Sequence, residues 1–196
     1  MKQLALGISP PPQPTLDNFV PGANAELLAQ LRRFQAGRYA ESVLYLWGGA
    51  GSGKSHLIAA CAGQKAVDDV EKLDEAAQIG LFNAINEARQ QGGAVLAAGN
   101  APPAQLPLRE DLRTRLAWGL VFQVKPPSDE ERSAYLRAEA ARRGMPLPDE
   151  VIAWLLTRMR RDLRSLTAVL DRLDRYSLET KRPITLPLVR EALKDE

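Results

Sequence analysis

The sequence predicts an α/β fold with a parallel sheet, followed by a C-terminal helical unit. Residues 43–47 form a continuous apolar run, typical of a parallel strand buried on both faces, and 94–98 and 120–124 are further candidate strands. After Ser128 the apolar residues recur at helical spacing instead. The 196 residues suffice for one α/β domain and a small helical appendage. We expect a flexible arm over 1–15, an α/β unit over 16–126 and a helical unit over 127–196.

The composition excludes several classes of protein. Apolar residues make up 45% of the chain, so it is not intrinsically disordered. No apolar run approaches the roughly 18 residues that span a bilayer, and the start shows no secretory signal. Cys61 is the single cysteine, so the chain has no internal disulfide. We expect Cys61 to be a small core residue. A reducing, cytoplasmic location of the protein is the simplest expectation. A net charge of +2 does not by itself indicate a nucleic-acid binder.

The central motif is a glycine-rich loop of the form Gly48-x-x-x-x-Gly53-Lys54-Ser55. It follows the predicted strand 43–47 and precedes a predicted helix over 55–62, which is the setting of a phosphate-binding P-loop. Its glycines let backbone N–H groups point inward at an anion, and the N-terminus of the helix adds positive charge. We predict that Lys54 neutralises the β- and γ-phosphates and that the Ser55 hydroxyl holds Mg²⁺.

A chance match to this motif is disfavoured, because the strand, the lysine and the serine are all in place. His56 is the only histidine, and we expect it to pack beside the loop. The predicted nucleotide-binding residues of this stretch are Gly48, Gly49, Ala50, Gly51, Ser52, Gly53, Lys54, Ser55 and His56.

Polar side chains follow two further candidate strands. A nucleotide hydrolase needs one carboxylate to hold Mg²⁺ and a second to orient the attacking water, and Asp68 and Asp69 are candidates for these roles. Few apolar residues precede them, so a surface turn between two helices is the alternative. Asn100 follows strand 94–98, at the end where ligands bind in open α/β sheets. An ordinary turn before prolines explains Asn100 equally well.

The two ends of the chain differ in character. The start contains Gln3, Leu4, Leu6 and Ile8, followed by a proline-rich run that is neither helix nor central strand. Both a peptide that docks on a partner and an ordinary chain terminus fit this stretch, and the residues alone favour the terminus. Ser128 with Glu131 forms a capping box that opens a helix to about residue 143. Further helices are expected over 25–37, 74–91, 109–116, 149–159, 162–180 and 186–194.

Taken in order, these features resemble the AAA+ ATPases, and their details resemble the DnaA-related branch, including its Hda-like regulators. The resemblance covers the chain from about Asp17 to its end. The matching strings are Asn18-Phe19-Val20-x-Gly22-x-Asn24, Gly53-Lys54-Ser55-His56-Leu57, Pro102-Pro103, Leu112-Arg113-Thr114-Arg115-Leu116-x-Trp118-Gly119 and Arg161-Asp162-Leu163-Arg164-x-Leu166. Singly, only the P-loop and the string around Arg115 are specific.

The resemblance implies a three-layer AAA+ sheet with a C-terminal helical lid, and it implies ADP or ATP with Mg²⁺ as cofactors. The Mg²⁺ and water site would be Ser55, Asp68 and Asp69. By position, Asn100 corresponds to the strand-tip sensor, Arg115 to an arginine finger offered to a neighbouring molecule's nucleotide, and Arg164 to the lid sensor. Phe19 and Val20 correspond to the lining of the adenine pocket. Residues 3–8 resemble the peptide by which Hda-like proteins bind the sliding clamp of DNA polymerase, although Gly7 departs from its pattern.

One departure from the family is large. Only a short segment separates Lys54 from Asp68, whereas the family inserts a strand and a helix there, and a βαβ unit needs about 30 residues. We therefore expect four core strands with one edge strand lost, so that a new edge lies beside Asp68. The Asp-Asp strand would then be short, polar and peripheral, which puts intrinsic ATP hydrolysis in doubt.

The resemblance implies a regulator of replication initiation that, bound to nucleotide and the clamp, stimulates hydrolysis of ATP on DnaA. The expected partners are DnaA and the sliding clamp, with homodimerisation left open and no membrane partner. We expect no direct sequence-specific DNA binding, because the chain has no room for a helix-turn-helix domain after the lid. The alternatives are a stand-alone AAA+ ATPase or loader, and a binding module with a relict P-loop.

Overall fold

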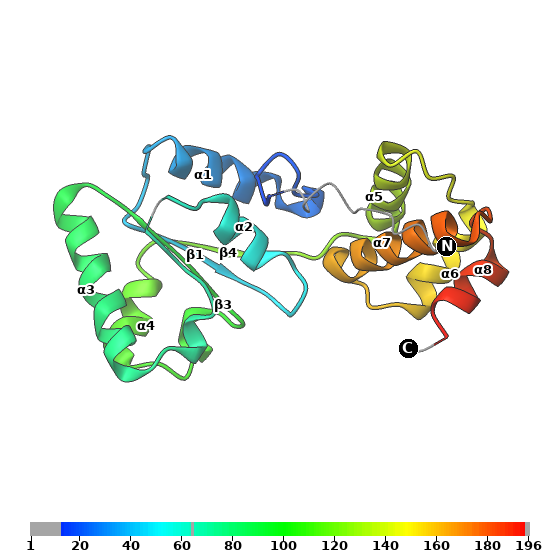
Figure 1. Cartoon of the computed structure of the whole chain (residues 1–196). Helices are drawn as coiled ribbons and strands as arrows, with labels where there is room; N and C mark the ends of the chain where they lie inside the picture. Colours follow the sequence, from blue (N-terminus) through cyan, green and yellow to red (C-terminus); the bar gives the residue numbers. More distant parts are fainter. Residues whose placement is uncertain (1–12, 64, 195–196) are drawn as a thin grey trace. The chain divides into compact units, whose positions relative to one another are not determined.

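The computed structural model describes residues 13–63 and 65–194, which fall into two compact units. Residues 13–126 form an α/β unit, and the described residues from 127 onward form a helical unit. Figure 1 shows the elements of both units in chain order. The expected docking peptide of Gln3, Leu4, Leu6 and Ile8 lies outside the described residues.

The α/β unit is built on a parallel sheet of four strands in the order β2-β3-β1-β4. Tyr45 in the central strand faces Ala97 on one neighbour and Val121 on the other. The apolar runs that predicted two buried strands indeed form β1 and β3, so the predicted α/β fold is confirmed. The strands are β1 (Val43–Trp47), β2 (Ala66–Val67), β3 (Val95–Gly99) and β4 (Leu120–Gln123).

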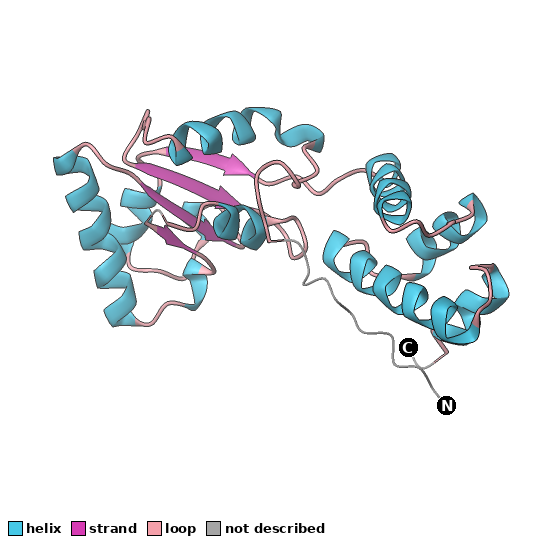
Figure 2. Ribbon diagram, turned by 45° about the horizontal axis from the view of Figure 1, so that its top comes forward, coloured by secondary structure: helices cyan, strands magenta, loops and turns pink. Residues whose placement is uncertain are grey.

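Helices cover both faces of the sheet and give three layers (Figure 2). On one face the core includes Leu31, Leu46 and Leu57, supplied by α1, β1 and α2. On the other face Ile85 of α3 and Leu112 of α4 pack against β1 and β3. The helices are α1 (Ala25–Gln35), α2 (Lys54–Ala60), α3 (Glu75–Gln91) and α4 (Glu110–Leu116), and the 3₁₀ turns are η1 (Gly22–Asn24), η2 (Val70–Lys72) and η3 (Pro103–Gln105).

β2 is a shortened strand at the edge of the sheet, as the short segment between Lys54 and Asp68 predicted. It has two residues, Ala66 opposite Leu96 and Val67 opposite Ala97. An apolar hollow of about 360 Å³ opens between β2 and α3, where no further strand and helix cover the edge. The Asp-Asp pair therefore follows a strand and does not lie in a turn between two helices.

The helical unit has one core shared by its helices. Leu136, Leu155, Leu170 and Leu188 are fully buried in it. The predicted capping box is present, because the Glu131 N–H donates to Ser128 Oγ and the Ser128 N–H donates to Glu131 Oε2. No described helix is long and apolar enough to cross a membrane. The helices are α5 (Asp129–Arg142), α6 (Asp149–Arg158), α7 (Leu163–Thr180) and α8 (Leu186–Ala192).

The observed helix ends differ from the predicted ones by a few residues, and the caps explain two of the differences. Asp74 and Asp162 precede α3 and α7 as N-caps, with their carboxylates accepting from the N–H groups of Ala77 and Ser165. Both residues are extended and lie outside the helices that they stabilise.

Candidate functional site

The glycine-rich loop connects the carboxyl end of β1 to the first turn of α2, as the motif predicted. Two of its glycines are required by close neighbours. A Cβ at Gly48 would lie 2.7 Å from the Val124 carbonyl oxygen, and one at Gly53 would lie 2.7 Å from Phe19 Cε2. Gly53 also has a φ of +102°, in the region that favours glycine. The loop is thus held between the Phe19 segment and the residue after β4.

Lys54 and Ser52 give this loop the features of an anion site. Lys54 is buried, and its Nζ donates to the carbonyl oxygens of Gly48 (2.8 Å) and Gly49 (3.1 Å). The ammonium group is therefore fixed inside the loop. Ser52 Oγ is also buried and has no hydrogen-bond partner among the described residues. An orphaned hydroxyl and a buried ammonium group in a glycine cradle fit the phosphates of a nucleotide.

The residues expected beside the base and the loop lie around Gly53. The Phe19 ring contacts the Gly53 backbone, and its centroid is 5.6 Å from that of His56. His56 Nε2 lies 2.8 Å from the Thr15 carbonyl oxygen, so the imidazole packs beside the loop as expected. Val20 is half-buried in the same segment, and Ser55 is exposed on the first turn of α2.

The polar residues at the strand tips are brought to neighbouring positions by the sheet. Asp68 and Asp69 follow β2, and Asn100 follows β3, which pairs with both β2 and β1. Asp68 Oδ1 accepts from the Asp69 N–H, and Asp69 Oδ2 forms an ion pair with Lys72 at 2.6 Å. Asp69 also has a φ of +49°, which is uncommon for a residue with a side chain.

Glu71 is a strand-tip residue that the sequence interpretation missed. Its Oε2 accepts from the Asn100 N–H at 3.3 Å, so it links the turn after β2 to the tip of β3. Burial, together with the Glu71 charge, raises the pKa of Tyr45, whose hydroxyl donates to the Ala101 carbonyl oxygen at 2.8 Å. The signal for Glu71 was its position two residues after the acidic pair.

No group of three or more His, Cys, Asp or Glu side chains could hold a metal ion within residues 13–63 and 65–194. This is compatible with Ser55 and Asp68 as Mg²⁺ ligands, because Mg²⁺ beside a nucleotide takes few protein ligands and keeps phosphate oxygens and waters.

Arg115 lies on α4, and its side chain contacts α3. Its Nε donates to Asn86 Oδ1 at 2.9 Å. Its Cζ is 3.5 Å from the Trp118 ring centroid and 5.2 Å from that of Phe82. The side chain is half-buried and belongs to a surface of the α/β unit.

Arg164 lies in the first turn of α7, in the helical unit, and is exposed. Asp162 caps this helix two residues before it. Within its own unit, Arg164 is thus available to an anion at the start of α7, and its predicted role as a lid sensor stays a prediction.

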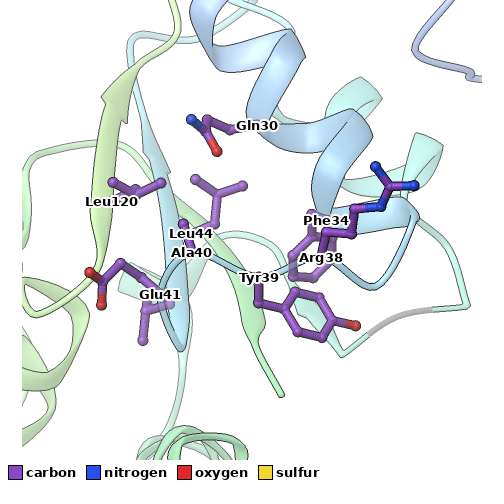
Figure 3. A pocket seen from close by; sticks show the side chains of 9 residues that line it. Gln30, Phe34, Arg38, Tyr39, Ala40, Glu41, Leu44 and Leu120 are labelled. Atoms are coloured by element: carbon purple, nitrogen blue, oxygen red, sulfur yellow. The ribbon is translucent and has the colours of Figure 1, made fainter. Parts of the chain in front are cut away.

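A small hollow at the other end of β1 is too confined to be the site. Figure 3 shows it between α1, the start of β1 and β4, with Phe34, Tyr39 and Leu120 among its lining residues. Its volume of about 20 Å³ has room for roughly one water. Ligands of open α/β sheets bind at the carboxyl ends of the strands, where the glycine-rich loop lies.

The helical unit matches a known family. Residues 129–193 match the model described as "Hda, lid domain", which spans α5 to α8. The helical unit is therefore similar to the Hda lid domain. This confirms the resemblance to the Hda-like branch that the sequence strings indicated.

Solved structures with the same fold include initiators and a motor. Domain III of Thermotoga maritima DnaA aligns with a TM-score of 0.77 and 24% identity, over 94% of this chain and 98% of that one. AMPPCP-bound DnaA from Aquifex aeolicus aligns with a TM-score of 0.70 and 18% identity, over 82% of this chain and 64% of that one. The Thermotoga maritima RuvB Holliday junction branch migration motor aligns with a TM-score of 0.69 and 18% identity, over 92% of this chain and 71% of that one. The chain therefore has the AAA+ fold that the sequence predicted.

Proposed function

We propose that this protein is a nucleotide-bound regulator that docks on the DNA polymerase sliding clamp and stimulates hydrolysis of the ATP held by DnaA. The observation that carries the proposal is Arg115. Its guanidinium has no carboxylate partner among the described residues, in a chain with an AAA+ sheet and an Hda lid domain. By stimulating hydrolysis of the ATP held by DnaA, the regulator would switch the initiator off.

The chemistry of Arg115 suits this role. Hydrolysis of ATP builds negative charge on the oxygens of the transferred phosphoryl group, and a guanidinium placed there accelerates the reaction by about 10³–10⁵-fold. Asn86 accepts from Nε of Arg115, and no described group accepts from its two Nη atoms. These two atoms form the planar fork that donates to two phosphate oxygens at once.

Weak intrinsic turnover is the expected counterpart. β2 is two residues long and lies at the edge of the sheet. Asp69, the candidate for orienting water, is in an ion pair with Lys72 on the surface. The Asp69 carboxylate would have to leave Lys72 before it could orient a water molecule. Asp69 and Asn100, the two candidate catalytic residues of this chain's own site, would then contribute little turnover. The ATP hydrolysis that the protein controls would take place in the site of the partner.

The resident nucleotide would be ADP or ATP with Mg²⁺. Lys54 and the loop from Gly48 to Ser55 would hold its phosphates, and Ser55 with Asp68 would hold the metal. The bound nucleotide would supply the negative charge that Lys54 neutralises. Phe19, Val20 and His56 would lie at the base, and Arg164 would contact phosphate from the lid. The fold shared with AMPPCP-bound DnaA supports this assignment.

Docking on the clamp would use Gln3, Leu4, Leu6 and Ile8. The match of the lid to the Hda family supports this partner and DnaA as the second one. We infer a cytoplasmic location from these partners, and we expect no sequence-specific contact with DNA.

The test is hydrolysis of DnaA-bound ATP in the presence of clamp loaded on DNA. Wild-type protein should accelerate hydrolysis, and Arg115→Ala should lose this acceleration while still binding the clamp. Arg33→Ala is the matched control, because Arg33 is an exposed arginine on α1, remote in sequence from the finger. Full stimulation by Arg115→Ala, or none by the wild-type protein at any clamp concentration, would reject the proposal.

A further inference from the structure

The surface where α3 and α4 pack beside Trp118 carries a second arginine, Arg89, that the proposed function does not use. Arg89 of α3 places its Cζ 4.5 Å from the Trp118 ring centroid, and Arg115 of α4 places its Cζ 3.5 Å from the same centroid. One indole therefore holds two guanidinium groups, supplied by two helices. Trp118 itself is 40% exposed, so this stack reaches the solvent.

The two guanidinium groups lack a counter-charge, as several other described arginines do, but here the two unpaired cations meet at one aromatic ring. Neither Arg89 nor Arg115 has a carboxylate within ion-pair distance in residues 13–63 and 65–194. Several other arginines do pair with acids, namely in Arg32–Asp17, Arg109–Asp111, Arg132–Asp129, Arg137–Asp149, Arg143–Glu139 and Arg182–Glu191. Two like charges beside one ring repel each other, and the attraction of each cation to the ring offsets this. The arrangement leaves a concentration of positive charge that a polyanion would neutralise.

The geometry also fixes which part of each side chain is available. Arg115 is held on two sides, by Trp118 through its guanidinium face and by Asn86 through Nε. Arg89 is exposed and is held by the ring alone. A side chain fixed by stacking loses less conformational freedom on binding, so the ring prepares both cations before a partner arrives.

Resting on the proposed function, we propose that Trp118 positions Arg89 and Arg115 as a pair of cations for the triphosphate bound to the partner. Arg115 contacts the γ-phosphate as the finger. Arg89 is a second donor to the same polyphosphate, and it acts on the charge that grows during hydrolysis. Trp118 is a positioning residue that touches neither the nucleotide nor the attacking water.

The competing explanation is that Trp118 and Arg89 only dock the partner protein. A docking role would raise the concentration of partner needed for half-maximal stimulation and leave the maximal rate unchanged. The proposed role lowers the maximal rate, because the charge is needed in the transition state. The two explanations therefore separate in one titration.

The experiment measures the rate of hydrolysis of DnaA-bound ATP, with loaded clamp, as the concentration of DnaA is varied. It compares wild-type protein with Arg89→Gln, Arg89→Lys, Trp118→Phe and Trp118→Leu. We expect the maximal stimulated rate to fall about tenfold in Arg89→Gln, the loss of one charge-assisted contact. Arg89→Lys keeps the charge and should recover most of it. Trp118→Leu removes the ring and should lower the maximal stimulated rate roughly three- to tenfold, whereas Trp118→Phe should lower it about twofold. Thermal unfolding of each variant confirms that these surface changes leave the fold intact.

Arg115→Ala and Arg33→Ala complete the set of variants. They distinguish a failure of the second-cation role from a failure of the proposed function. If Arg115→Ala abolishes stimulation but Arg89→Gln keeps the full maximal rate, or changes only the half-maximal concentration, the second cation is rejected and the proposed function stands. If Trp118→Leu matches wild type in maximal rate, the positioning role is rejected in the same way. Stimulation that survives Arg115→Ala rejects the proposed function and this inference with it.

Discussion

The side-chain amide of Asn24 is bonded to the backbone of Lys125 through both of its polar atoms. Nδ2 donates to the Lys125 carbonyl oxygen and Oδ1 accepts from the Lys125 N–H, each at 2.8 Å. Asn24 is buried at the end of η1, and Lys125 lies just after β4. This pair joins the segment that carries Phe19 to the end of the sheet that carries the glycine-rich loop.

Replacing Asn24 with alanine should therefore destabilise the α/β unit. The change removes two hydrogen bonds and leaves the N–H and the carbonyl oxygen of Lys125 without their partner, at a cost of about 1–2 kcal/mol in the free energy of unfolding. Urea unfolding followed by circular dichroism measures it. Asn83→Ala is the control, because Asn83 is exposed on α3. Equal stability of the two variants would show that the Asn24 bonds contribute nothing.

A second prediction compares two glycines of the α/β unit. A Cβ at Gly119 would lie 2.0 Å from the Val43 carbonyl oxygen, whereas one at Gly80 would meet nothing within 4 Å. Gly119→Ala should cost about 3 kcal/mol or more, since the backbone of β1 cannot move away. Gly80→Ala, in the middle of α3, should stabilise by roughly 0.5–1 kcal/mol. Thermal denaturation ranks the two, and a stable Gly119→Ala variant would contradict the close approach of these strands.

A third prediction concerns Lys54. Its ammonium group is buried and held by two carbonyl oxygens of the loop. Removing it as Lys54→Ala should weaken binding of ADP by more than roughly tenfold, because a charge-assisted contact to phosphate is lost. Isothermal titration calorimetry measures this, with Lys65→Ala, an exposed residue paired to Glu87, as the control. Unchanged affinity in Lys54→Ala would place the nucleotide elsewhere.

The central strands, the glycine-rich loop and the capped helices were predictable because each follows a local rule. Residues 43–47 are apolar throughout, the loop matches a motif with a mechanism, and Ser128 with Glu131 is a capping box. The short edge strand was also predictable, since the number of residues between Lys54 and Asp68 cannot form a βαβ unit. In these places local sequence and chain length leave few alternatives.

The contacts that the sequence could not predict join residues far apart in the chain. Arg89 meets Arg115 and Trp118 only because α3 packs beside α4. Glu71 reaches Asn100 only because β2 pairs with β3. No spacing rule encodes such meetings, because they depend on how elements dock and on which rotamers they allow. The candidate site was therefore predictable in its loop and not in the surroundings of Arg115.

Cys61 should be an unreactive thiol. It is buried at the end of α2, and burial raises its pKa to about 11. The thiolate is the reactive form, so at pH 8 the native protein should react with a disulfide reagent more than roughly 100-fold slower than the unfolded chain. Absorbance of the released thiol measures both rates. Rapid labelling of the native protein would show that α2 opens or that Cys61 is accessible.

The last prediction concerns the pH dependence of the helical unit. Burial acts to raise the pKa of Asp162, but bonds from the Ser165 N–H and Oγ outweigh it, so the pKa lies below its ordinary value. A carboxyl group with a lowered folded pKa stabilises above its unfolded pKa of about 4, and this contribution is lost as the pH falls through the folded value.

At pH 7, Asp162→Ala should therefore cost about 1 kcal/mol, the usual contribution of an N-cap. Asp162→Asn keeps an acceptor that cannot be protonated in this range, so it should lose less stability than wild type on acidification. Melting temperatures of the three proteins between pH 7 and pH 3 test this. The difference between wild type and Asp162→Ala should shrink below about pH 4, because protonation removes the same acceptor that the alanine removes. A difference that stays constant to the lowest pH would mean that the Asp162 carboxylate is not what caps α7.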